Sequence, residues 1–338
     1  MIAALNGDVA SWDAFAERTE GSSFCHLAAW RDILSDVLGA ECLYRGVRDA
    51  DGNWQGILPL VRVKSWLFGH YLVSLPFLNG GGPLGSADAR RQLVDEAVAE
   101  AKRSRADLLE LRSRDPDGSD LPVSSRKITV ILPLPPSVDE LFQGFPSKLR
   151  NQIRRPMKEG LTVRFGLDQR EAFYSVFART MRDLGTPVLP AALFERIAAA
   201  FPDLVEFAVV YRGEQPVAAG CGFMWRQEFE ITWAGALRAS RAISGNMLLY
   251  WSFMERMIAR GMRAFNFGRC TPGSGTHRFK QQWGGSDVPL PWGQYATRGV
   301  TAPPSPKEGT FSWGPTLWRR MPLAVANLLG PRLVRFLP

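Results

Sequence analysis

A group of residues that could carry out chemistry lies near the end of the chain, in the segment FGRCTPGSGTHRFKQQWGG, residues 267–285. The segment combines glycines with three potential cations, His277, Arg278 and Lys280, and with two large aromatic residues. Glycines allow a backbone to approach a ligand closely, and a positioned ammonium group can stabilise a developing oxyanion without proton transfer. The segment therefore predicts a loop and a short helix that presents a cationic binding or catalytic group.

Lys280 is the strongest catalytic candidate in this segment. Phe279 and Trp283 are four residues apart, so they share one side of a helix and are expected to pack into the domain. Lys280 then lies one residue round from an anchored aromatic and need not point into bulk water. A lysine on a short helix is more often a solvated charge, and the residue pattern alone leaves that alternative open. Thr276 is expected to cap the helix.

A second candidate segment is basic. Residues 146–163 read PSKLRNQIRRPMKEGLTV, and Arg150 and Arg154 share one face of the expected helix. This arrangement suits a clamp for phosphate or carboxylate groups. The alternative is a solvated helix face.

A third candidate segment is the glycine-rich loop of residues 77–84, FLNGGGPL, with Asn79, Gly80 and Gly81 as its binding residues. Consecutive glycines allow close approach of a ligand, and their N–H groups can bind anions. The loop lacks the lysine and the spacing of a Walker A motif, so nucleotide binding by that route is not supported. A plain flexible turn is the alternative.

Composition narrows the possible classes of function. With 338 residues, 46% of them hydrophobic and 22% charged, the chain predicts a globular protein of two domains. Its four cysteines form no C-x-x-C pair and its three histidines no H-E-x-x-H motif, so no disulfide framework or metal site is expected. No secretion signal and no run of about 18–20 apolar residues is present, which predicts a cytoplasmic protein.

The positive charge is concentrated late in the chain. From Arg263 onward there are ten Lys or Arg residues and two acidic residues, which accounts for the whole net charge of +8. Such an imbalance favours an anionic partner, either nucleic acid, a phosphorylated substrate or an acidic membrane surface. Simple solubility is the alternative.

The pattern of hydrophobic residues predicts the same order of elements in both halves of the chain: two helices, three meandering strands, a helix and a strand. This order indicates an α+β fold with helices packed on mostly antiparallel sheets. The proline-rich segments PLPP and APPSPK suggest breaks, which gives domains at 1–136 and 137–300 and a tail at 301–338. The expected elements of the first half are helices 10–19, 27–38 and 87–104 and strands 41–48, 54–63, 67–75, 107–112 and 127–132, and those of the second half are helices 169–183, 191–200 and 243–260 and strands 204–211, 216–225, 228–236 and 264–267.

The tail has the composition of a segment that lies on a membrane surface. Residues 311–338 contain Trp313, Trp318 and four arginines among leucines, and Pro322 and Pro331 divide the tail into short pieces. Tryptophans suit the headgroup level and arginines suit anionic lipid. We therefore expect peripheral contact with the inner face of the membrane.

The segment 267–285 resembles the C-terminal signature of the FemAB-like family of peptidyltransferases. In that family a strand leads to Phe-Gly-Arg, a glycine loop, aromatic-Arg-Phe-Lys and aromatic-Gly. The segments SKLRNQIRRPMKEGLTV, RTMRDLGTPVLPAALF and GILPLVRVKSWLFGHYLVSLPFLNGGG are similar to further parts of the family, in order from about residue 24 to 296. The similarity is closest to the branch associated with exopolysaccharide and exosortase (PEP-CTERM) gene systems.

This resemblance implies two tandem acetyltransferase-like (GNAT) domains and acyl transfer from an ester to an amine. The better-known members of the FemAB-like family move amino acids from aminoacyl-tRNA to a peptidoglycan precursor peptide. By the same resemblance Lys280 stabilises the transition state and Phe279 positions it. Arg150, Arg154, Arg269 and Arg278 are then expected to hold phosphates of the donor or of a lipid-linked acceptor. No bound cofactor is implied, because aminoacyl-tRNA or acyl-CoA serves as a co-substrate.

Some features of the sequence depart from the family and leave alternatives open. No helical arm is inserted between residues 160 and 210, and Asn79 and Leu84 stand where known members carry tyrosines. A second hypothesis is an acyl-CoA-dependent N-acyltransferase, although residues 238–246, RASRAISGN, contain a single glycine for the pyrophosphate. A third is a non-catalytic adaptor at the membrane face. Asp183 and Glu230 are candidate general bases by location alone.

Overall fold

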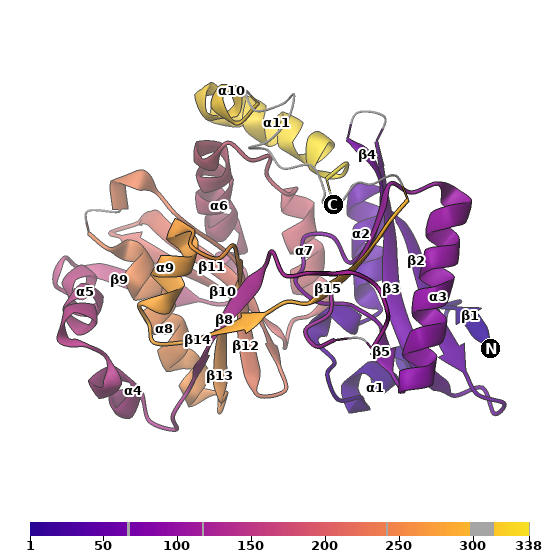
Figure 1. The fold of residues 1–338 in the computed structure, drawn as a ribbon. Coiled ribbons are helices and arrows are strands. Elements are labelled where there is room, and N and C mark those ends of the chain that lie inside the picture. The colour runs from indigo at the N-terminus through magenta and orange to yellow at the C-terminus, as the bar shows by residue number, and fades with distance from the viewer. Residues whose placement is uncertain (66–67, 117, 241–242, 298–313, 338) are drawn as a thin grey trace. The chain divides into compact units, whose positions relative to one another are not determined.

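The computed structural model describes residues 1–65, 68–116, 118–240, 243–297 and 314–337 (Figure 1). The chain divides into two compact units. The first is built on Met1–Lys127 and the second on Ile128–Val288. Each unit is an α+β domain with its own sheet and its own hydrophobic core.

Unit 1 carries helices on both faces of a mostly antiparallel sheet. Among the described residues the sheet runs in the order β1-β2-β3-β4-β6-β15-β7, β5 pairs with β3, and β4 and β6 are parallel. Side chains alternate along β3, so Leu58 packs toward α3 while Ile57 packs toward α1. The elements are β1 (Ile2–Ala4), α1 (Val9–Arg18), η1 (Phe24–His26), α2 (Ala29–Leu38), β2 (Glu41–Arg48), β3 (Trp54–Ser65), β4 (Gly69–Ser74), β5 (Leu84–Gly85), α3 (Ala87–Ser104), β6 (Leu108–Leu111), β7 (Val123–Ser124) and β15 (Trp292–Ala296).

Unit 2 repeats this plan. Its sheet runs in the order β14-β8-β13-β12-β11-β10-β9, and β12 and β13 form a parallel pair. The elements are β8 (Ile128–Pro133), α4 (Val138–Gly144), α5 (Ser147–Lys158), β9 (Leu161–Phe165), η2 (Leu167–Gln169), α6 (Arg170–Leu184), α7 (Ala191–Ala200), β10 (Val205–Arg212), β11 (Gln215–Trp225), β12 (Glu228–Ala236), η3 (Arg238–Ser240), α8 (Gly245–Ala259), β13 (Ala264–Cys270), α9 (Gly275–Gln281) and β14 (Ser286–Pro289).

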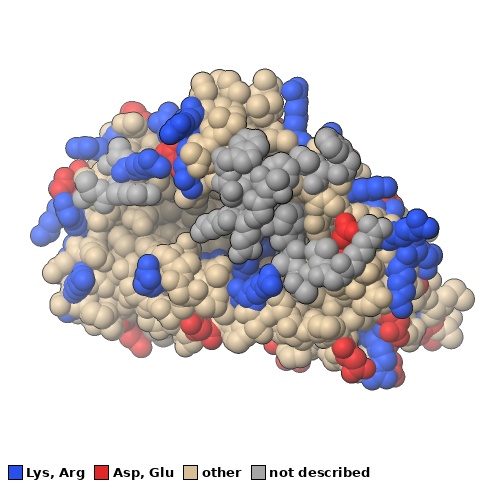
Figure 2. Space-filling view, turned by 45° about the horizontal axis from the view of Figure 1, so that its top comes forward, with Lys and Arg blue, Asp and Glu red and all other residues tan. Residues whose placement is uncertain are grey.

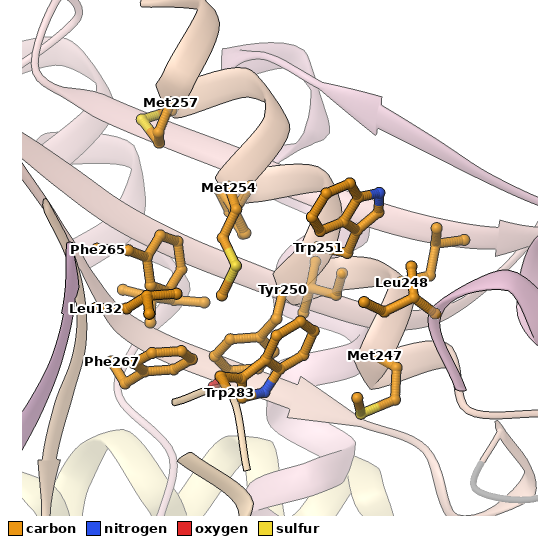
Figure 3. Close-up of a cluster of buried hydrophobic side chains, with 14 of the residues drawn as sticks. Leu132, Met247, Leu248, Tyr250, Trp251, Met254, Met257, Phe265, Phe267 and Trp283 are labelled. Carbon is orange, nitrogen blue, oxygen red and sulfur yellow. The ribbon is translucent and has the colours of Figure 1, made fainter. Parts of the chain in front are cut away.

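The core of unit 2 is rich in aromatic and methionine side chains. Helix α8 is apolar on nearly all sides and lies against the sheet, with its Tyr250 stacked on Phe267 of β13 at 5.7 Å between ring centroids. Figure 3 shows Met254 of α8 beside Phe265 of the same strand, and Trp283 closing the cluster near Tyr250. Because aromatic pairs add to the free energy of area burial, this cluster gives the region after β13 a rigid support.

Two strands belong to units other than those expected from the sequence. The expected boundary at 136/137 places residues 128–133 in the first domain, but β8 pairs with β13 in unit 2. Likewise β15, expected in the second domain, pairs with β6 in unit 1. Strand pairing depends on hydrogen bonds between residues that are far apart in the sequence. The positions of proline-rich segments do not predict which strands pair.

The tail forms two helices, α10 (Gly314–Arg320) and α11 (Leu323–Val334). Helix α10 lies on α6, and Arg182 of α6 donates a hydrogen bond to the carbonyl oxygen of Met321 at 3.0 Å. Helix α11 continues through Pro331, so the break predicted there from the sequence is wrong. None of the helices in the described part of the chain is long and apolar enough to cross a bilayer.

Figure 2 shows how charged side chains are distributed on one face of the molecule. Lys and Arg side chains are spread across the face drawn in Figure 2 rather than gathered in a single field. On this face the Lys and Arg side chains, which give the chain its net charge of +8, do not mark a binding site.

Candidate active site around Lys280

Helix α9 is held at both of its ends. Ser274 is its N-cap, and the hydroxyl of Ser274 accepts a hydrogen bond from the N–H of His277 at 3.1 Å. The expected cap, Thr276, lies inside the helix instead. The Nδ1 atom of His277 accepts the N–H of Gly273 at 3.0 Å, so Nε2 carries the proton and faces Asp287 of β14 at 2.9 Å.

The two aromatic residues Phe279 and Trp283 anchor α9, as their spacing predicted. Trp283, just after the helix, is 1% exposed and makes an edge contact with Phe145 at 5.7 Å between ring centroids. Phe279 is half-buried and makes an edge contact with Tyr250 of α8 at 5.0 Å. These contacts fix the rotation of α9 and thereby the direction of the residues between them.

Lys280 is turned into the protein. Its side chain belongs to a residue only 3% exposed, and Nζ donates hydrogen bonds to the carbonyl oxygens of Gly268 at 2.5 Å and Arg269 at 2.9 Å. An ammonium group has three N–H donors. These two carbonyls are the acceptors that the described residues provide, so one N–H remains available for a further oxygen.

The two carbonyls reach Lys280 because β13 is irregular at this point. The pairing of β13 with β8 shifts between Asn266 and Arg269, and Gly268 has a φ of 68°, in the left-handed region that favours glycine. The side-chain oxygen of Asn266 accepts the N–H of Gly268 at 2.9 Å and the hydroxyl of Thr129 of β8. The bulge is therefore fixed by side chains and not by strand pairing alone.

The bulge coincides with the place where two central strands stop pairing. The parallel ladder of β12 and β13 ends at the pair Glu230 and Asn266, although both strands continue. Glu230 is 7% exposed, and the amide nitrogen of Asn266 lies 3.5 Å from its Oε2. Three features therefore lie near the end of this ladder: Lys280, the part of β13 that no longer pairs with β12, and the buried carboxylate of Glu230.

Burial controls the charge of Lys280. Desolvation lowers the pKa of its ammonium group from 10.5 to about 8, and the neighbouring Cys270 and Glu230 oppose this shift. With a pKa of about 8, roughly nine in ten molecules are protonated at pH 7. The site therefore presents a buried positive charge under ordinary conditions.

The other candidates in the same segment are arranged differently. The carbonyl of Arg269 contacts Lys280, whereas Arg278 is exposed and donates to the carbonyl of Gly273 at 3.3 Å. Cys270 is 6% exposed, and both ring nitrogens of His277 are engaged elsewhere. A Cys–His pair for nucleophilic catalysis is therefore not formed.

The basic helix α5 packs its two candidate arginines against α4. Arg150 donates to the side-chain oxygen of Gln143 at 2.6 Å, and the guanidinium of Arg154 lies 4.9 Å from the ring centroid of Phe142. Helix α4 was absent from the expected elements, although Ser137 and Glu140 have the spacing of a capping box. The phosphate clamp stays a prediction.

The glycine-rich loop lies in unit 1 and is not a free turn. Asn79 is 8% exposed, and Gly80, Gly81 and Gly82 are buried. The carbonyl of Gly82 contacts Nε2 of His26 at 3.0 Å, and its N–H donates to the carbonyl of Arg112 at 2.9 Å. The binding role of Asn79, Gly80 and Gly81 stays a prediction, but the loop is held by packing and hydrogen bonds.

The remaining candidates are the segment at the start of α8 and the two carboxylates considered as general bases. Ser244 is at the N-cap position, with a φ of 57° and no capping hydrogen bond from its side chain. The proposed pyrophosphate segment 238–246 includes residues 241 and 242, which lie outside the described residues. Asp183 forms an ion pair with Arg182 at 2.7 Å. Of the two candidate carboxylates, Glu230 is the one whose charge raises the pKa of Lys280.

Comparison with known proteins supports the reading of the fold. Residues 147–281 match the family model described as an acetyltransferase (GNAT) domain. No curated protein sequence matches the chain significantly. Among solved structures, the chain is similar to FemX, with 15% identity, a TM-score of 0.65 and coverage of 88% of this chain and 98% of FemX.

Two other solved structures are similar over most of the chain. L-PGS from Bacillus licheniformis is 16% identical, with a TM-score of 0.56 and 97% of each chain covered. A tandem GNAT protein from the clavulanic acid biosynthesis pathway is 14% identical, with a TM-score of 0.52 and coverage of 89% of this chain and 99% of that one. The chain has a tandem GNAT fold. In this tandem GNAT chain the family model covers most of the unit that contains Lys280.

Proposed function

We propose that this tandem GNAT chain is an acyltransferase that moves an aminoacyl group from an aminoacyl-tRNA-type donor to an amine of a cell-envelope peptide or glycan intermediate. The observation that carries the proposal is the buried ammonium of Lys280 at the bulge of β13, with one N–H left unused by Gly268 and Arg269. The match of residues 147–281 to an acetyltransferase domain supports acyl transfer. The aminoacyl donor and the envelope acceptor, including the exopolysaccharide systems, are supported by the motif resemblance.

The chemistry needs a positive group at the carbonyl of the donor ester. The acceptor amine attacks the carbonyl carbon, a C–N bond forms, the ester C–O bond breaks, and the amine proton ends on the released hydroxyl. In the tetrahedral intermediate the carbonyl oxygen becomes negative, and the unused N–H of Lys280 would donate to it. Glu230 is the candidate to relay the amine proton, because its charge already acts on Lys280.

A direct test compares Lys280→Met with the wild type and with Lys102→Met, an exposed lysine on α3. Transfer is measured from radiolabelled aminoacyl-tRNA to a nucleotide- or lipid-linked envelope precursor. Loss of an oxyanion donor lowers kcat by about 10²–10³-fold, while Lys102→Met should keep wild-type activity. If Lys280→Met stays within a few-fold of the wild type and remains folded, the assigned role is wrong.

An acyl-CoA donor is the second candidate, and one observation favours it. The matching family model is that of an acetyltransferase domain, and it covers α8 and the strands on either side. Titration of the protein with acetyl-CoA and with longer acyl-CoA thioesters separates the two donors. Micromolar or tighter binding, together with transfer to an amine, would replace the aminoacyl-tRNA donor in the proposal.

We also propose that α10 and α11 contact an anionic membrane surface. Three apolar side chains of these helices face solvent: Leu317 is 54% exposed, Val325 40% and Leu328 59%. Val325 and Leu328 share one face of α11 with Arg332, while Ala326 lies on the buried side. Residues 314–337 contain four arginines and no acidic residue, which complements anionic lipid.

The two tryptophans expected at the headgroup level do not support this surface. Trp318 is 8% exposed and packs inward, and Trp313 lies outside the described residues. The membrane proposal therefore rests on the exposed leucine and valine side chains and on the arginines. Flotation with phosphatidylglycerol vesicles should fall for Val325→Glu/Leu328→Glu but not for Val123→Glu, an exposed site in unit 1. Equal flotation of both variants would remove the membrane contact from the proposal.

A further inference from the structure

Unit 1 contains a small polar cavity beside its glycine-rich loop. The cavity has a volume of about 50 Å³, room for several water-sized groups. It lies among η1, the loop before β5, the first turns of α3 and the segment that follows β6. The residues that matter for the argument are Gly80, Gly82, His26, Arg90, Arg112 and Ser113.

The wall of this cavity depends on glycine. A Cβ atom at position 82 would lie 2.1 Å from the hydroxyl of Ser113, and one at position 80 would lie 3.0 Å from the hydroxyl of Ser23. Gly81 has a φ of 98°, which other residues rarely adopt. The run of three glycines is therefore required by the space and the backbone conformation at the cavity.

A buried histidine holds this wall in place. Nδ1 of His26 accepts the N–H of Ser23 at 3.0 Å, so Nε2 carries the proton and donates to the carbonyl of Gly82 at 3.0 Å. Burial lowers the pKa of His26, which keeps the ring neutral. His26 is thus a structural tie and brings no charge to the cavity.

Two donors at the cavity have no hydrogen-bond partner among the described residues. Ser113 is 7% exposed, and its Oγ is buried without a partner. The Nε of Arg90, on a different element, is likewise buried without a partner. Native proteins seldom leave buried donors unsatisfied, so two of them at one cavity point to a group that accepts from both.

The charges at the cavity favour an anion. Arg112 is neutralised by Glu110 through an ion pair of 2.9 Å, and Nη1 of Arg112 donates to backbone carbonyls. Arg90, Arg114 and Asp115 also line the cavity. The guanidinium of Arg90, whose Nε has no hydrogen-bond partner among the described residues, therefore suits an acceptor with several oxygens and a negative charge.

We propose that this cavity binds a single oxyanion group, a phosphate or carboxylate of a substrate, through Arg90 and Ser113. The proposal deepens the proposed acyl transfer by giving an acidic group of one substrate a place in unit 1, and it rests on that function only for the identity of the substrate. Binding is measured without transfer, so failure of one proposal is distinguishable from failure of the other.

The experiment follows the melting temperature of the full chain while inorganic phosphate, acetate or chloride is added at constant ionic strength. A ligand that binds the native state raises the melting temperature saturably. In the wild type, phosphate or acetate should raise the melting temperature and chloride should not. The anion with the larger effect indicates whether the cavity binds a phosphate or a carboxylate group. Arg90→Met and Ser113→Ala should weaken the apparent affinity at least tenfold, while Arg91→Met, an exposed neighbour on α3, should keep it.

Three outcomes would overturn the proposal. The first is an effect of phosphate and acetate no larger than that of chloride, which would mean that the cavity holds water alone. The second is equal weakening by Arg90→Met and Arg91→Met, which would indicate a non-specific surface effect. The third is unchanged phosphate and acetate affinity in Ser113→Ala, a variant that keeps all charges and tests the cavity even if Arg90→Met does not fold.

Discussion

The buried charge of Lys280 should make the stability of the protein depend on pH in a specific way. In the unfolded chain its pKa returns to about 10.5, whereas in the native state it is about 8. Between these two values the unfolded chain binds more protons than the native protein, so the free energy of unfolding rises as pH rises. The cost of burying the charge is fully present below pH 8 and disappears above pH 10.5.

The size of this effect follows from the two pKa values. Each unit of difference between the native and unfolded pKa corresponds to about 1.4 kcal/mol, so the full effect of lowering it from 10.5 to about 8 is ~3 kcal/mol. About 2 kcal/mol of this lies between pH 7 and pH 9.5, before most tyrosines and arginines titrate. Lys280→Met removes the titrating group but also leaves the carbonyls of Gly268 and Arg269 without their donor. The pH dependence, and not the stability at one pH, therefore isolates the charge.

The assay is urea unfolding of the wild type, Lys280→Met and the exposed control Lys102→Met at pH 7 and pH 9.5. The wild type and Lys102→Met should change in parallel. The free energy of unfolding of Lys280→Met should fall behind that of both other proteins by about 2 kcal/mol between the two pH values. The reason is that this variant has no buried lysine whose deprotonation stabilises the native state as the pH rises. Parallel behaviour of all three proteins, with unchanged denaturant slopes, would refute the burial of a charged Lys280.

Two further substitutions test the surroundings of the two candidate sites. Gly268→Ala should lower the unfolding free energy by about 1–2 kcal/mol, since its φ of 68° is unfavourable for alanine, while Gly275→Ala in α9, with open space around it, should cost little. Arg112→Met should cost about 3–5 kcal/mol, because it leaves the buried carboxylate of Glu110 unpaired, whereas Arg164→Met, which breaks an exposed pair, should cost at most about 1 kcal/mol. Urea unfolding measures all four, and a cost for Arg112→Met no greater than that for Arg164→Met would contradict the assignment.

The elements with strong periodic patterns were predictable from the sequence. Helix α8 was expected at 243–260 and lies at Gly245–Ala259, and its end at Gly261 follows from a φ of 77° there. The anchoring of α9 by Phe279 and Trp283 was predictable for the same reason, since residues four apart share a helix face. Such features are local, and a short window of sequence contains all the information they need.

Features that depend on distant partners were not predictable in this way. The bulge at Gly268 requires Asn266 from the same strand and Thr129 from β8, and nothing in FNFGRC indicates that strand as a partner. The cavity of unit 1 likewise brings together η1, the glycine-rich loop, the start of α3 and the segment after β6, which are far apart in the sequence. One local signal was available, because an asparagine between two phenylalanines of a strand is expected to be buried and then needs a hydrogen-bonding partner.

The exchange of strands has a consequence for how the protein is made. The sheet of unit 1 includes β15, which leaves the ribosome only after the whole sheet of unit 2 has been synthesised. During synthesis the edge of β6 that pairs with β15 therefore stays unpaired while about 180 further residues are added. At ordinary rates of elongation this takes on the order of ten seconds or more. An exposed strand edge is a template for wrong pairing. Chains released early, or cut between the two halves, would expose that edge permanently, so degradation or chaperone binding is the expected fate of truncated forms.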